Sequence, residues 1–94
     1  MISIVFFTRA LPSRLADELG SRGINCHEAL AISEVFHLCE RPDIGLVVID
    51  ASVDDERAKV VQQRFPTLRL RQEATVQDAM WEIVNLLGGV SAIQ

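Results

Sequence analysis

One continuous apolar run that stops on a carboxylate limits the possible folds of this chain more than any other feature. The run is Gly45–Asp50, and four consecutive large aliphatic residues, 46–49, form its centre. Parallel strands buried on both faces have such unbroken sequences, whereas half-exposed strands alternate apolar and polar residues. In open α/β sheets, ligands bind beyond the carboxyl ends of the strands. The run therefore predicts a central parallel strand, with Asp50 at the edge of the sheet where chemistry takes place.

Segments of strand-like and helical periodicity alternate along the whole sequence. Strands are expected at 2–7, 24–28, 46–50 and 68–71, and helices at 11–22, 31–40, 54–65 and 75–87. Strands that alternate with helices form parallel sheets with right-handed crossovers, so that helices cover both faces. The first and third strands are the most apolar and are therefore placed in the centre, which gives the strand order 2-1-3-4. We expect one α/β domain over residues 1–94, with three αβα layers and a four-stranded parallel sheet.

Proline and glycine residues mark the expected ends of the helices. Pro12 suits the first turn of the first helix, where a missing N–H costs nothing. Pro42 and Pro66 follow the second and third helices, because a residue before proline avoids the helical conformation. Gly88 and Gly89 are expected to close the last helix.

The charge of the chain argues against nucleic acid as a partner. The chain contains nine Lys and Arg residues and 13 Asp and Glu residues, which gives a formal net charge of −4. Binding to nucleic acid instead depends on clustered cations. Only Arg69 and Arg71 share a strand face. No apolar run reaches the ~18 residues that cross a bilayer, and the sequence begins without the basic region of a signal peptide. We therefore expect a cytoplasmic protein that does not act on membranes.

The first half of the chain follows the pattern of response-regulator receiver domains. Gly23 ends the first helical region, Ala29 follows the second strand, Pro42-Asp43 leads into the third strand, and Asp50 ends it. In this register the chain resembles the receiver family, which has a flavodoxin-like fold. The resemblance implies that Asp50 occupies the position of the phosphoacceptor. Receivers have five βα units and this chain has room for four, so the resemblance implies a shortened domain.

The residues that support phosphoryl transfer in that family are replaced here. Receivers hold Mg²⁺ with an acidic pair at the end of the first strand, where this chain has Phe6 and Phe7. Aromatic rings do not ligate a hard cation that requires oxygen. The phosphate-binding Lys falls near Gln72, and the Thr or Ser position has no clear equivalent. Because a lone carboxylate reacts poorly with an anionic donor, the resemblance implies the fold and argues against the activity.

Asp50 is therefore open to two interpretations. It is either a phosphoacceptor or a strand-end carboxylate that caps the following turn through its side chain. Arg9 ends the first strand next to Thr8, close to Asp50 in this strand order, and would pair with Asp50 or bind an anion. The acidic run 54–56 is expected to be a solvated first helical turn rather than a metal cluster, because negative charge there favours the helix dipole.

No other pattern in the sequence indicates catalysis. There is no Gly-rich phosphate loop, no Ser-His-Asp set and no HExxH motif. Cys26 and Cys39 fit no metal or redox spacing and are expected to be buried thiols. His27 and His37 have no carboxylate or thiol at ligand spacing. We expect no cofactor, no bound metal and no enzymatic activity.

The last strand and the last helix form the expected binding surface. Leu68, Arg69, Leu70 and Arg71 alternate apolar and basic residues, as in an edge strand with one wet face. Trp81 falls beside the apolar stripe of the last helix, either as an interface residue or as a cover at the edge of the core. The resemblance implies that output and dimer contacts use this face. A missing βα unit would also expose a sheet edge that invites pairing with another chain.

These observations lead to one preferred function and two alternatives. The preferred one is a non-catalytic, receiver-like signalling domain that docks to a protein partner or forms a homodimer. The first alternative is a minimal phosphoacceptor of a two-component system, phosphorylated at Asp50. A small-ligand binder at the carboxyl ends of the strands ranks last, because no phosphate-cradling loop supports it.

Overall fold

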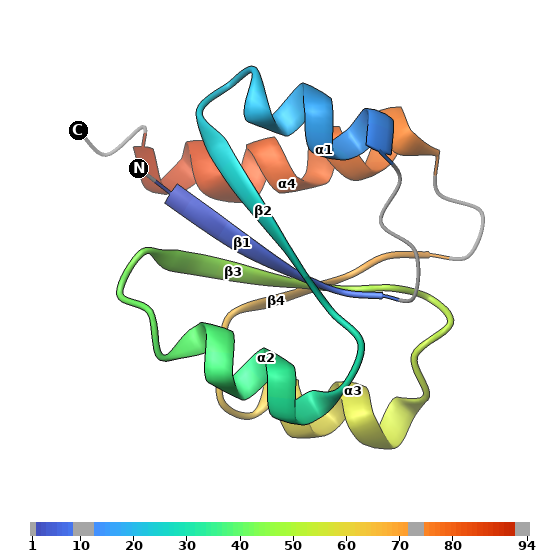
Figure 1. Ribbon diagram of the computed structural model, residues 1–94. Coiled ribbons are helices and arrows are strands. Elements are labelled where there is room, and N and C mark those ends of the chain that lie inside the picture. Colours follow the sequence, from blue (N-terminus) through green and yellow to red (C-terminus); the bar gives the residue numbers. More distant parts are fainter. Residues whose placement is uncertain (1, 9–12, 72–74, 92–94) are drawn as a thin grey trace.

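The computed structural model describes residues 2–8, 13–71 and 75–91. Their elements are β1 (Ile2–Phe7), α1 (Ser13–Gly20), β2 (Ile24–Ala29), α2 (Ile32–Cys39), β3 (Ile44–Ile49), α3 (Asp55–Gln62), β4 (Thr67–Arg69) and α4 (Val76–Ser91). The strands form one parallel sheet of order β2-β1-β3-β4. Helices α1 and α4 cover one face, and α2 and α3 cover the other (Figure 1). The predicted α/β fold, its three layers and its strand order are confirmed, and they are those of a flavodoxin-like fold.

Helix and strand ends differ from the expected bounds by a few residues. Helix α4 continues through Gly88 and Gly89 to Ser91, so the expectation that the glycine pair ends it is wrong. Glycine permits a left-handed stop but also accepts helical dihedral angles, at a cost of about 1 kcal/mol. Only Gly23 has a positive φ among the described residues, 81°, in the turn that follows α1. The expected start of α1, with Pro12, lies outside the described residues.

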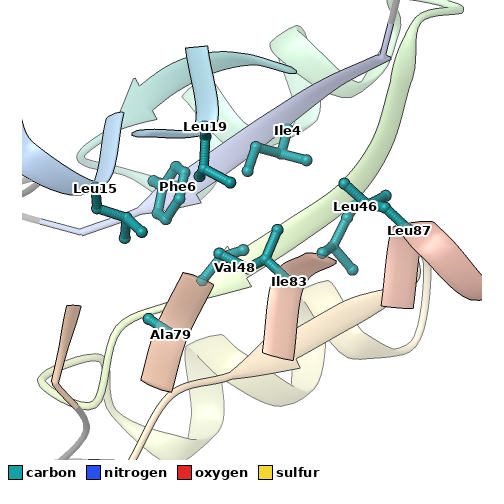
Figure 2. Packing of buried hydrophobic residues seen from close by; sticks show 9 residues of the cluster. All are labelled: Ile4, Phe6, Leu15, Leu19, Leu46, Val48, Ala79, Ile83 and Leu87. Carbon is teal, nitrogen blue, oxygen red and sulfur yellow. The ribbon is translucent and has the colours of Figure 1, made fainter. Parts of the chain in front are cut away.

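The sheet separates two apolar clusters. The first lies under α1 and α4 and contains Ile4, Phe6, Leu15, Leu19, Leu46, Val48, Ala79, Ile83 and Leu87 (Figure 2). The second lies under α2 and α3 and contains Val5, Phe7, Ala29, Val35, Val47, Ile49, Ala58 and Val61. Successive strand residues point to opposite faces, so β1 and β3 contribute to both clusters. This arrangement explains why these two strands have the unbroken apolar sequences of central strands.

A group of hydrogen bonds joins β1 to the turn that precedes β3. Ser3 is fully buried, and its hydroxyl donates a hydrogen bond to the Asp43 carboxylate. The backbone N–H of Ser3 also donates to the Asp43 carbonyl oxygen, at 2.9 Å. Arg41 Nε donates to Asp43 Oδ1 at 3.2 Å. The hydrogen bond from Ser3, with a smaller contribution from the Arg41 guanidinium, lowers the pKa of Asp43 from its ordinary value of 3.8.

The ionised Asp43 carboxylate is expected to stabilise the fold at neutral pH and to stop doing so in acid. Its pKa is lower in the folded than in the unfolded chain. Its contribution is therefore present above the unfolded value of about 4 and is lost as the pH falls through the folded pKa. Urea unfolding across this range should show a smaller loss of stability on acidification for Asp43→Asn than for the unsubstituted chain. Asp17→Asn, an exposed control, should follow the unsubstituted chain, and equal losses in all three proteins would contradict the prediction.

Candidate functional site

The carboxyl ends of β1 and β3 bring Thr8 and Asp50 together. The two strands are neighbours and parallel, so both chains leave the sheet at the same edge. Thr8 follows β1 and is 7% exposed. Asp50 follows β3 and is half-buried, and its backbone N–H donates to the Phe7 carbonyl oxygen at 3.1 Å. The structure therefore places the Asp50 carboxylate at the edge where the sequence predicted the site.

Both oxygens of the Asp50 carboxylate accept hydrogen bonds from neighbouring groups. Oδ2 accepts from the hydroxyl of Ser52 at 2.6 Å and from the hydroxyl of Thr8 at 3.1 Å. Oδ1 accepts from the backbone N–H of Ala51 at 2.9 Å. The Asp50 carbonyl oxygen also accepts from the N–H of Val53 at 3.1 Å, which closes the turn. This geometry is that of the second interpretation, a carboxylate that caps the turn after its strand.

We expect Asp50→Asn to lower the free energy of unfolding by about 1–3 kcal/mol, because an amide accepts through one oxygen only. One of the donors around Oδ1 and Oδ2 would then face an NH₂ group. Asp17→Asn is the matched control, since Asp17 is exposed on α1, and a change within about 0.5 kcal/mol is expected there. Urea unfolding of both variants checks this, and equal stabilities would mean that the turn does not depend on the carboxylate.

Phe6 and Phe7, the last residues of β1, lie beside the end of β3. Each side chain is 2% exposed, and the two pack into opposite apolar clusters. At this edge β1 therefore offers the Thr8 hydroxyl rather than carboxylates. No group of three His, Cys, Asp or Glu side chains in the described part of the chain is arranged to hold a metal ion. The arrangement supplies hydroxyl and amide donors around one carboxylate.

A pocket of about 260 Å³ opens beside the Asp50 turn. Its lining consists of Phe7, Thr8, Leu30, Ser52, Val53, Asp54 and Arg57. The charged residues among the described part of this lining are Asp54 and Arg57, and they form an ion pair with Arg57 Nε and Asp54 Oδ1 3.4 Å apart. Leu30 is 59% exposed at the rim. The described lining is therefore mainly polar and holds one ion pair, with Phe7, Leu30 and Val53 as its apolar part.

The acidic run at the start of α3 is bound to arginines. Asp54 pairs with Arg57, and Asp55 Oδ1 lies 2.6 Å from Arg69 Nη2. All three acidic side chains, including Glu56, are exposed. The predicted solvated first turn is confirmed.

The predicted binding residues of β4 and α4 divide between the core and the surface. Leu68 and Leu70 are half-buried and pack against the first apolar cluster. Arg69 is exposed, and its Nη2 donates to the Val53 carbonyl oxygen at 3.1 Å as well as to Asp55. Trp81 is 59% exposed on the outer surface of α4. The partial exposure that the sequence predicted for Trp81 is confirmed.

Arg9 and Gln72, which the sequence placed near the site, lie outside the described residues. The thiols of Cys26 and Cys39 are free and half-buried, and burial raises the pKa of each. Thiols of this kind are poor nucleophiles, which agrees with their expected structural role. The Nε2 atom of His27 is buried without a hydrogen-bond partner in the described part of the chain.

Two features of the site were not found from the sequence. Ser52 donates the shortest hydrogen bond to Asp50, and the Asp50-Ala51-Ser52 spacing of a side-chain-capped turn was the available signal. Leu30 was also missed, because an exposed leucine after a strand has no distinctive pattern. Its position at the pocket depends on where the β2–α2 connection crosses the edge of the sheet.

Comparisons with known proteins found no match, either among family models, among curated proteins or among solved structures. None of the helices described is long and apolar enough to cross a membrane.

Proposed function

We propose that this chain is a receiver-like protein-interaction domain that works without phosphoryl transfer. The observation that carries the proposal is the environment of Asp50. Both of its carboxylate oxygens are engaged by the donors of its own turn and by Thr8. The side chains of Phe6 and Phe7, the two β1 residues beside it, are buried in the core.

The chemistry of phosphoryl transfer explains why this environment favours binding over catalysis. A carboxylate that attacks a phosphoryl donor brings two anions together, and cations at the site must offset that repulsion. Among the described residues, the groups that donate hydrogen bonds to the Asp50 carboxylate are two hydroxyls and a backbone amide. Arg57, the cation that lines the adjacent pocket, is already paired with Asp54. The hydrogen-bonded Asp50 carboxylate therefore stabilises the turn at the carboxyl end of β3.

The surface of β4 and α4 is the proposed docking region. Trp81 and Leu86 are 59% and 47% exposed on α4. An exposed tryptophan is the residue type that most often contributes a large share of binding energy at interfaces. Strand β4 forms one edge of the sheet. The partner is a protein, either a second copy of this chain or another molecule, in a cytoplasmic signalling role.

Incubation with Mg²⁺ and acetyl phosphate, followed by intact-mass spectrometry, tests the proposal. We expect no phosphoryl adduct on the unsubstituted chain. An adduct that is absent from Asp50→Asn would instead establish the alternative function, a minimal phosphoacceptor. Asp43→Asn is the matched control. It removes a carboxylate just before β3, at the opposite end of the strand from Asp50, and should leave any reaction at Asp50 unchanged.

A further inference from the structure

Strand β4 directs half of its backbone groups away from the sheet. The Pro66 carbonyl oxygen accepts from Val47 N–H at 3.0 Å, and Leu70 N–H donates to the Ile49 carbonyl oxygen at 2.9 Å. Because backbone groups alternate along a strand, residues 66, 68 and 70 face β3, and Thr67 and Arg69 face outward. In the described part of the chain, no hydrogen bond reaches the outward groups of these two residues. This row of donors and acceptors is open to another strand.

The face of β4 on the α3 side is basic. Leu68 and Leu70 pack under α4, so Arg69 points to the opposite face, where it reaches Val53 and Asp55. Arg71 follows two residues later, is exposed and has no ion-pair partner in the part of the chain that the structure describes. In a protein of net charge −4, this edge presents Arg71 as a cation to a strand that would lie beside it, next to Arg69, which is paired with Asp55.

The face on the α4 side is apolar. Met80 and Leu86 stand three residues before and after the buried Ile83, so they lie on opposite flanks of α4. Met80 lines a groove with Arg14 and Glu18 of α1. Leu86 therefore lies on the flank away from α1, above the β4 side of the sheet, where it is 47% exposed.

We propose that this edge binds an extended segment of another protein, in which acidic and apolar residues alternate, as an additional strand next to β4. The inference rests on the proposed interaction function and names its partner. Alternate side chains of a strand point to opposite faces. An acidic residue of the segment would pair with Arg71 on the α3 side, next to the Arg69–Asp55 pair. Its apolar residues would extend the surface of Leu68, Leu70 and Leu86 on the α4 side.

The same charges disfavour a second copy of the chain as the occupant. Antiparallel self-pairing around a two-fold axis centred on Arg69 sets that residue opposite itself. Centring the pair on Leu70 sets Arg69 opposite Arg71. Like charges directly opposite each other destabilise strand pairs, and charged edge residues prevent edge-to-edge association. An acidic partner strand removes this repulsion, which is why the edge fits a different molecule.

Amide hydrogen exchange of the full chain, with and without a synthetic peptide, tests the inference. The probe is a peptide of about ten alternating valine and glutamate residues, long enough for a typical strand. At saturation we expect the amides of Thr67 and Arg69 to become protected. The amide of Leu70, which is already bonded to Ile49, should keep its protection and serves as the internal reference. Unchanged exchange at Thr67 and Arg69 would overturn the inference.

Peptide and protein variants test the role of charge. A peptide that alternates valine and lysine, and one that groups the same valines and glutamates in two blocks, should bind at least tenfold more weakly. Arg71→Glu should weaken binding of the alternating acidic peptide about threefold to fivefold, the size of one exposed ion pair. Arg14→Glu makes the same charge change on α1 and should have no effect. Equal binding of all three peptides, or equal effects of the two substitutions, would contradict the inference.

The outcomes separate this inference from the proposed function. A phosphoryl adduct on Asp50 would overturn the proposed function without reference to β4. A dimer in light scattering whose Thr67 and Arg69 amides are protected without any peptide would overturn the inference in favour of a second copy, and would leave the proposed function intact. A monomer that protects Thr67 and Arg69 in the presence of the acidic peptide would support both.

Discussion

Replacing Phe7 with aspartate is expected to leave most of the chain unfolded at room temperature. Phe7 is 2% exposed in the cluster under α2 and α3. Truncating a buried phenylalanine costs about 3–5 kcal/mol, and an unpaired carboxylate in the same place adds several more. A domain of this size has about 5–15 kcal/mol of stability in total, so the substitution removes much or all of it.

Phe7→Leu is the matched control for this substitution. It keeps an apolar side chain in the cluster and should cost about 1–2 kcal/mol, so that the protein stays folded. Far-ultraviolet circular dichroism and urea unfolding compare the two variants. The aspartate variant also tests the resemblance to receivers, because that resemblance implies an acidic pair at positions 6 and 7. If it folds and gains stability with Mg²⁺, then the end of β1 can accept a metal ion, and the prediction that this variant unfolds is wrong.

Replacing Ile83 with alanine is expected to lower the free energy of unfolding by about 2–5 kcal/mol, the range for large aliphatic residues in cores. Ile83 is fully buried and points from α4 into the first apolar cluster (Figure 2). Removing its side chain beyond the β-carbon leaves a cavity between α4 and the sheet. The midpoint of urea unfolding should fall while its slope stays unchanged.

Leu86→Ala is the matched control in the same helix. Leu86 is 47% exposed, so the loss should be less than about 1 kcal/mol. Equal losses in the two variants would mean that α4 does not dock on the sheet as described. The control has a second use, because Leu86 borders the proposed strand site. Leu86→Ala should therefore weaken binding of the acidic peptide in a protein whose stability is nearly unchanged.

Most of the fold was predictable from the sequence because it follows from local periodicity. The aliphatic run 46–49 is typical of a strand covered on both faces, and this pattern placed β3 in the centre of the sheet. Phe6 and Phe7 are adjacent, so they had to enter opposite layers. The end of α4 was not predictable in the same way, because Gly88 and Gly89 permit a stop without requiring one.

The position of the candidate site followed from the sequence, whereas its chemistry did not. Asp50 lies at the end of a central parallel strand, so its place at the carboxyl edge follows from the strand order alone. The donors around it depend on the shape of one turn and on the side-chain conformations of Thr8 and Ser52. Whether this carboxylate is free or engaged is therefore a property of the folded edge.

The amino-acid sequence by itself determined the layers, the strand order and the side of the sheet on which each central residue lies, because these depend on patterns within a few residues. Only the tertiary structure decided which polar groups pair. Ser3 forms a hydrogen bond with Asp43, 40 positions away in the sequence. Arg69 of β4 forms an ion pair with Asp55 at the start of α3. Such contacts depend on register and on crossover geometry, which strand periodicity leaves undetermined.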